Sequence, residues 1–157
     1  MKNELKQELT RRLCECNNGG LVLVMYDIYF GFSDDVKAAL ASNDRTALKK
    51  AVADVQAALD ELIGALDFKY PLAGQLYPLY SYCKRLFSTV LYSLDVSLVD
   101  EADGIMKKLR SSFETVAAGD KSAPLMDNAQ KVYAGMTYGK GRLTESFIND
   151  NNRGFLA

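Results

Sequence analysis

The sequence predicts an all-α fold: an antiparallel four-helix bundle with an additional N-terminal helix and an irregular C-terminal tail. Apolar residues recur at helical spacing nearly everywhere as far as residue 117. The breaks between the periodic stretches are short, so consecutive long helices should lie antiparallel. The chain has 157 residues, of which 48% are apolar and 25% charged, and this composition is typical of a globular protein with a proper core.

The first three predicted helices cover residues 2–16, 20–41 and 44–67. The Asn-Asn-Gly-Gly stretch of residues 17–20 separates the first helix from the second. The Ser-Asn-Asp stretch of residues 42–44 offers N-caps for the third helix. The second helix should place the following residues in the core: Leu21, Val24, Met25, Ile28, Phe32, Val36 and Ala39.

The fourth and fifth predicted helices cover residues 72–94 and 97–117. Pro71 suits the first turn of the fourth helix, and Ser97 can cap the fifth. Pro78 cannot donate a hydrogen bond to the carbonyl four residues earlier, so it should either kink the fourth helix or mark its true start.

The composition changes after the fifth helix. We predict a helical bundle over residues 1–118 and a C-terminal tail over residues 119–157. The tail has several glycines and a linker-like opening, but it also holds too many apolar and aromatic residues for a solvated disordered chain. We therefore expect it to dock on the bundle or on a neighbouring molecule.

Composition and motifs exclude several classes of function. A net charge of −1 gives no basic field that would attract nucleic acid. The sequence also has no run of about 18 apolar residues, which is the length needed to span a membrane. The charged opening residues lack the apolar core of a signal peptide, so we expect a cytoplasmic protein. The chain has no histidine, the commonest metal ligand and general base. We therefore predict no catalytic residues, no metal and no cofactor, and an enzyme is not expected.

The second helix has more apolar surface than one core-facing stripe. At about 100° per residue, Leu23, Tyr26 and Phe30 fall within about 60° of one another, opposite Ile28 and Phe32. Exposed together, they would form an apolar patch that marks a binding groove. Alternatively the N-terminal helix or the tail covers this side, and the two interpretations are compatible.

The third and fourth helices offer weaker surface candidates. The back of the third helix carries four small residues: Ala53, Ala57, Gly64 and Ala65. Small side chains would let another helix come close, although alanine is also common in helices simply because it favours helix formation. On the fourth helix Tyr80 faces the core, Tyr77 and Tyr82 flank it on opposite edges, and Arg85 faces outward. Such edge tyrosines fit either a seam between helices or the rim of an interface.

Two motifs together resemble the flagellar secretion chaperones of the FliS family. The stretch "NNGGLVLVMYDI" (17–28) resembles the family's opening motif, with Gly19, Leu21, Leu23, Tyr26 and Asp27 in place. Where the family motif has a Thr-Pro pair, this chain has Asn17 and Asn18, and where the motif has a glutamate it has Gly20. The second motif, Leu-Tyr-x-Tyr followed by arginine, is matched by "LYSYCKR" (79–85). The resemblance covers about residues 17–117.

The resemblance implies a cytoplasmic chaperone that binds the C-terminal segment of flagellin, prevents premature polymerisation and supports secretion during flagellum assembly. It implies no cofactor, and it leaves export-gate components as a further possible partner. On this interpretation Leu23, Tyr26 and Phe30 would form one wall of the client groove, with Tyr77, Tyr82 and Arg85 at an edge.

Two alternatives stay open at this point. The apolar tail could occupy the client groove of the free protein, in which case deleting residues 120–157 should raise client affinity. The protein could instead be a self-associating structural helical bundle whose second apolar face is a dimer interface. The oligomeric state is not fixed by the sequence.

Overall fold

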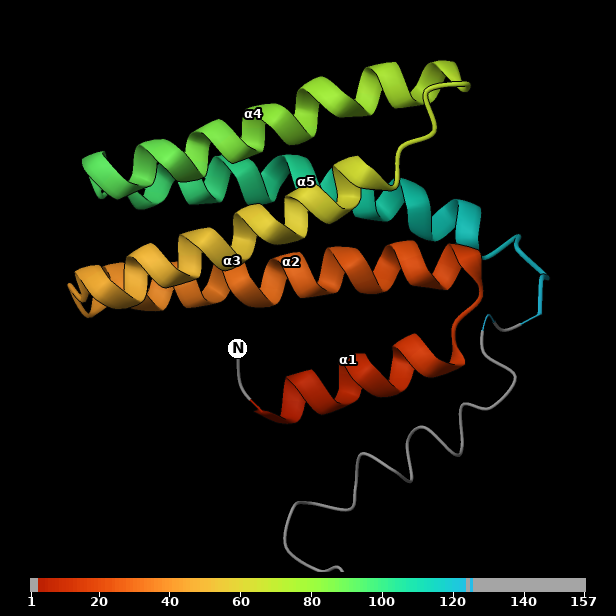
Figure 1. The fold of residues 1–157 in the computed structure, drawn as a ribbon, viewed down its shortest axis with the longest axis horizontal. Coiled ribbons are helices and arrows are strands. Elements are labelled where there is room, and N and C mark those ends of the chain that lie inside the picture. The colour runs from red at the N-terminus through yellow and green to blue at the C-terminus, as the bar shows by residue number, and fades with distance from the viewer. Residues whose placement is uncertain (1–2, 124, 126–157) are drawn as a thin grey trace, which may run out of the picture. The chain divides into compact units, whose positions relative to one another are not determined.

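The computed structural model describes residues 3–123 and 125. These residues form five helices and no strand, which confirms the predicted all-α class (Figure 1). The helices are the following: α1 (Asn3–Glu15), α2 (Asn18–Ala41), α3 (Arg45–Gly64), α4 (Pro71–Ser93) and α5 (Val96–Ala117).

Local capping explains where the helices begin. The Asn17 side chain accepts a hydrogen bond from the Gly20 N–H at the start of α2, and Asp44 accepts from Thr46 and Ala47 at the start of α3. The prediction that Ser97 caps α5 is wrong, because α5 begins one residue earlier and Asp95 accepts from the Ser97 N–H instead.

The two prolines of α4 have different roles. Pro71 lies in the first turn, as predicted, where its missing N–H has no helical partner to lose. Pro78 lies inside the continuous helix and so does not mark its start. The helix ends at Ser93, and the next residue, Leu94, caps it in the left-handed conformation with φ of 57°.

Four helices close a ring around the core. α2 packs against α3 and α5, α3 packs against α4, and α4 packs against α5. The largest side chains in the centre come from all four helices, and they include Tyr26, Tyr29, Leu59, Tyr80, Phe87 and Met106. The predicted four-helix bundle is therefore formed by α2 to α5.

Helix α1 lies outside this ring and packs against α2 (Figure 1). Leu9 and Cys14 of α1 are buried, and the Arg12 guanidinium lies 2.7 Å from an Asp27 carboxylate oxygen of α2. Val24 and Gly31, one turn on either side of Asp27, are also buried although they face away from the ring. We conclude that α1 covers this third face of α2.

The chain after α5 begins by returning to the junction of α1 and α2. The Leu125 N–H donates to the Cys16 carbonyl, and the side chains of Asn17 and Asp120 also link the two segments. The chain divides into two units, residues 1–127 and 128–157. Most of the predicted tail of residues 119–157 falls outside the described residues, so its docking stays a prediction.

Candidate docking groove

The apolar patch predicted on α2 is not a surface patch. The Tyr26 side chain is 0% exposed, and its hydroxyl lies 2.6 Å from the Tyr80 hydroxyl in the core. Its ring centroid lies 5.7 Å from that of Phe113 on α5. Tyr26 is therefore not exposed in an open groove, because α5 packs over this side of α2, and its role in partner binding stays a prediction.

The other two members of that patch lie differently. Leu23 is half-buried, and Phe30 is half-buried with its ring edge-on to Tyr29 at 5.2 Å between centroids. An ion pair of 2.7 Å between Asp27 and Arg110 fixes α2 against α5 beside them, and it raises the pKa of the Arg110 guanidinium. Partner binding by Leu23 and Phe30 stays a prediction.

The candidates on α4 lie at two opposite seams, as expected. Tyr77 is half-exposed and packs edge-on against Phe68, with ring centroids 5.9 Å apart. The Tyr82 hydroxyl donates to Glu101 of α5 at 2.6 Å, and this hydrogen bond raises the pKa of Tyr82. The Arg85 guanidinium lies 5.5 Å from the centre of the Tyr82 ring. No contact joins this group to Leu23 or Phe30 among the described residues.

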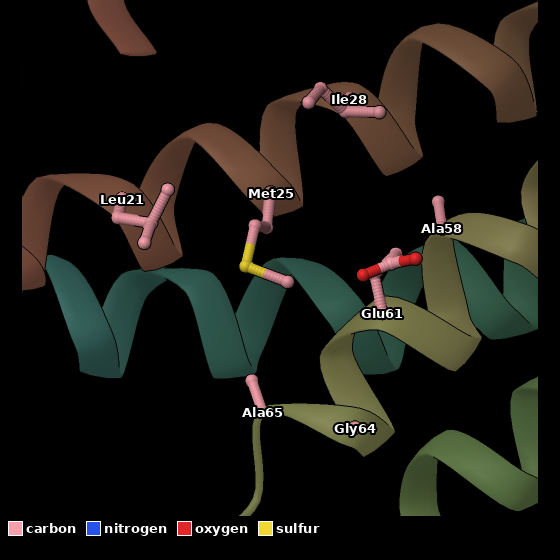
Figure 2. A pocket seen from close by; sticks show the side chains of 7 residues that line it. All are labelled: Leu21, Met25, Ile28, Ala58, Glu61, Gly64 and Ala65. Carbon is pink, nitrogen blue, oxygen red and sulfur yellow. The ribbon is translucent and has the colours of Figure 1, made fainter. Parts of the chain in front are cut away.

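The structure instead has a hollow between α2 and the end of α3. Its volume is about 560 Å³, and it is lined by Leu21, Met25, Ile28, Ala58, Glu61, Gly64 and Ala65. Figure 2 shows the three α2 side chains along one helix, with Ala58 and Glu61 on α3 and Ala65 just after its end. Large apolar residues on one helix therefore face small ones on the other, which leaves room between the helices.

A second hollow of about 550 Å³ lies further along the same pair of helices and shares no lining residue with the first. Phe32 of α2 and Ala47, Ala51 and Asp54 of α3 line it, and Lys6 of α1 reaches its edge. We call the two hollows together the α2–α3 groove. Its apolar floor of Leu21, Met25, Ile28 and Phe32 follows helical spacing and is about 17 Å long at 1.5 Å per residue.

The sequence predicts all four floor residues, including Leu21, to lie in the core. Met25, Ile28 and Phe32 do pack against the core, and all four are only partly buried. Several of the residues opposite them on α3 are too small to fill the space. The sequence did contain an indication of the groove: Gly64 and Ala65 belong to the small residues noted on the third helix, and both line the groove. Ala53 and Ala57 are exposed and do not line it.

The chemistry of the groove favours docking of apolar groups. The first hollow is lined mainly by hydrocarbon and thioether groups, with Glu61 as its charged member, whereas charged side chains such as Lys50 and Asp54 also line the second. Within residues 3–123 and 125, no cluster of acidic and cysteine side chains could hold a metal ion. A concave apolar surface of this kind is suited to the apolar face of an amphipathic helix.

Among the described helices, none has both the length and the apolarity to cross a membrane. A comparison with curated proteins gave no match. The family model described as flagellar protein FliS matches residues 1–120. The match spans most of the chain, which therefore belongs to the FliS family of flagellar export chaperones, a family of chaperones and not of enzymes.

Proposed function

We propose that the α2–α3 groove binds an amphipathic part of the C-terminal segment of flagellin in the cytoplasm. A flagellin molecule whose C-terminal segment is held in this way cannot use that segment to polymerise before export. The observation that carries the proposal is the groove itself: an apolar floor on α2 that the small side chains of α3 leave open.

The dimensions of the groove fit this client. A floor of about 17 Å accommodates about three turns of helix, so client residues at positions i, i+3 or i+4, and i+7 could each place an apolar side chain on it. Burying three or four such side chains would supply roughly 5–12 kcal/mol.

Gly64 gives a direct way to block the groove. A Cβ atom added at Gly64 would meet no described atom within 4 Å, and the residue is exposed in the wall of the groove. Gly104 on α5 is also open, since a Cβ atom added there would meet no described atom within 4 Å, and it lines neither hollow. The two glycines are therefore a matched pair for substitution.

The test compares Gly64→Glu with Gly104→Glu by titration calorimetry against the C-terminal segment of flagellin. Gly64→Glu should weaken binding at least about tenfold, which corresponds to about 1.4 kcal/mol, because it adds a bulky charged side chain to the wall of the groove. Gly104→Glu should bind as the wild type does. Equal affinity of the two variants would reject the groove as the client site.

Sedimentation analysis separates this function from the structural alternative. A chaperone should form a complex with the flagellin segment whatever its own oligomeric state. A tight dimer that ignores flagellin, and that Gly64→Glu dissociates, would show that the groove is an interface between two copies of this chain.

A further inference from the structure

A cluster of exposed apolar side chains lies where α3 passes into α4. Phe68 is 63% exposed, Tyr70 66%, Leu72 53% and Tyr77 46%. Folded domains seldom leave several large apolar side chains open to water at one place unless another molecule covers them. We call these four residues the α3–α4 rim, which in Figure 1 corresponds to the loop after α3 and the first turns of α4.

A cavity of about 280 Å³ lies beside the rim. Two rim residues, Tyr70 and Leu72, line it, and its other walls come from α2, α3, α4 and α5, including Leu62, Tyr80 and Phe113. The hydroxyl of Tyr80 is already paired with that of Tyr26. This end cavity therefore presents a mainly apolar interior.

The end cavity adjoins the α2–α3 groove. Met25 and Ala65 line both the end cavity and the groove hollow nearest to it. The two hollows therefore share a wall, and a polypeptide that lies in the groove is within reach of the end cavity.

The volume of the cavity indicates the kind of ligand. Pockets that hold a whole small molecule measure about 300–1,000 Å³, and the end cavity lies just below this range at about 280 Å³. A single large apolar side chain, such as that of leucine, methionine or phenylalanine, is a better match than a cofactor. The exposed rim then supplies apolar surface that closes over the inserted side chain.

We propose that the end cavity receives one large apolar side chain of the same polypeptide that fills the α2–α3 groove, and that the rim covers it. The proposal rests on the proposed function, since it extends the same client site around the end of α3. It adds a second point of attachment that fixes how far along the groove the client lies.

One test detects burial of the rim directly. The chain has no tryptophan, so Leu72→Trp supplies a single fluorescent reporter at the mouth of the cavity. Addition of a tryptophan-free C-terminal segment of flagellin should shift its emission to shorter wavelength. The control is Tyr92→Trp, at a position that is 86% exposed near the other end of α4, and its emission should not shift. Identical behaviour of the two reporters would overturn the proposal.

A second test measures the contribution of the rim to affinity. The double variant Tyr70→Ser/Leu72→Ser changes only exposed side chains, so it should fold normally, and it should bind the flagellin segment about tenfold more weakly than the wild type. Tyr92→Ser should bind as the wild type does.

The groove variant separates the two proposals. If Gly64→Glu loses affinity and the rim variant keeps it, the end cavity takes no part and the proposed function stands. If the rim variant loses affinity and Gly64→Glu keeps it, the groove is not the client site, and the continuity on which this inference rests is refuted.

Discussion

The buried pair of tyrosine hydroxyls allows a sharp test of how the core is built. Tyr26 of α2 and Tyr80 of α4 are 0% and 1% exposed, and their oxygens lie 2.6 Å apart. Tyr26→Phe keeps the ring and removes one hydroxyl, which leaves the Tyr80 hydroxyl without its partner. Leaving a buried polar group unsatisfied costs about 1–3 kcal/mol, whereas removing both partners can be nearly neutral.

We therefore expect each single variant, Tyr26→Phe or Tyr80→Phe, to lower the free energy of unfolding by about 1–3 kcal/mol. The double variant should lose less than the sum, with a coupling energy of at least about 1 kcal/mol. The assay is urea unfolding followed by circular dichroism. Strictly additive losses would show that the two hydroxyls do not depend on each other in the folded protein.

The same variants separate a core role from a binding role for Tyr26. Because this side chain is fully buried, Tyr26→Phe should bind the flagellin segment with wild-type affinity at temperatures where it is folded. A large loss of affinity without a loss of stability would mean that Tyr26 becomes exposed when the client binds.

Two further predictions concern buried polar groups. Asp103 of α5 is 4% exposed and accepts hydrogen bonds from Tyr29, Ser33 and Lys37 of α2. Asp103→Ala should therefore lower the free energy of unfolding, measured in urea, by about 3–5 kcal/mol. Asp103→Asn can still accept hydrogen bonds and should lower it by less, so equal losses for the two variants would contradict this account. Burial raises the pKa of Tyr26, Tyr29 and Tyr80 above the ordinary value of 10.0, so the stability that they contribute is present below that value and is lost as the pH rises above it. Tyrosinate absorbance from these residues should therefore appear together with the loss of the helical circular dichroism signal, and its appearance in a chain that is still helical would refute the assignment.

The positions of the helices were predictable because they depend on local signals. Apolar spacing, the Asn-Asn-Gly-Gly break, Asp44 and Pro71 act within one or two turns of the chain, and the helices begin and end within a few residues of the predicted limits. Tyr80 could be placed in the core for the same reason, since α4 has one dominant apolar stripe.

The location of the groove was not predictable in this way. Helix α2 is apolar on most of its sides, so its periodicity shows which residues share a face but not which neighbour covers that face. Tyr26 was a candidate for an exposed patch and lies in the core under α5, whereas Met25 and Ile28 pack against the core, as expected, but also line the groove. Only the packing of α1, α3 and α5 around α2 decides between these faces.

The sequence by itself therefore determined the number, limits and class of the helices, and it carried the motifs of the family. The tertiary structure alone decided which apolar surface of α2 stays open. The physical reason is that helix formation depends on residues within a few positions of each other, whereas an open groove depends on the volumes of side chains that face each other from different helices. Here Ala58, Gly64 and Ala65 are too small to fill the space beside Met25 and Ile28.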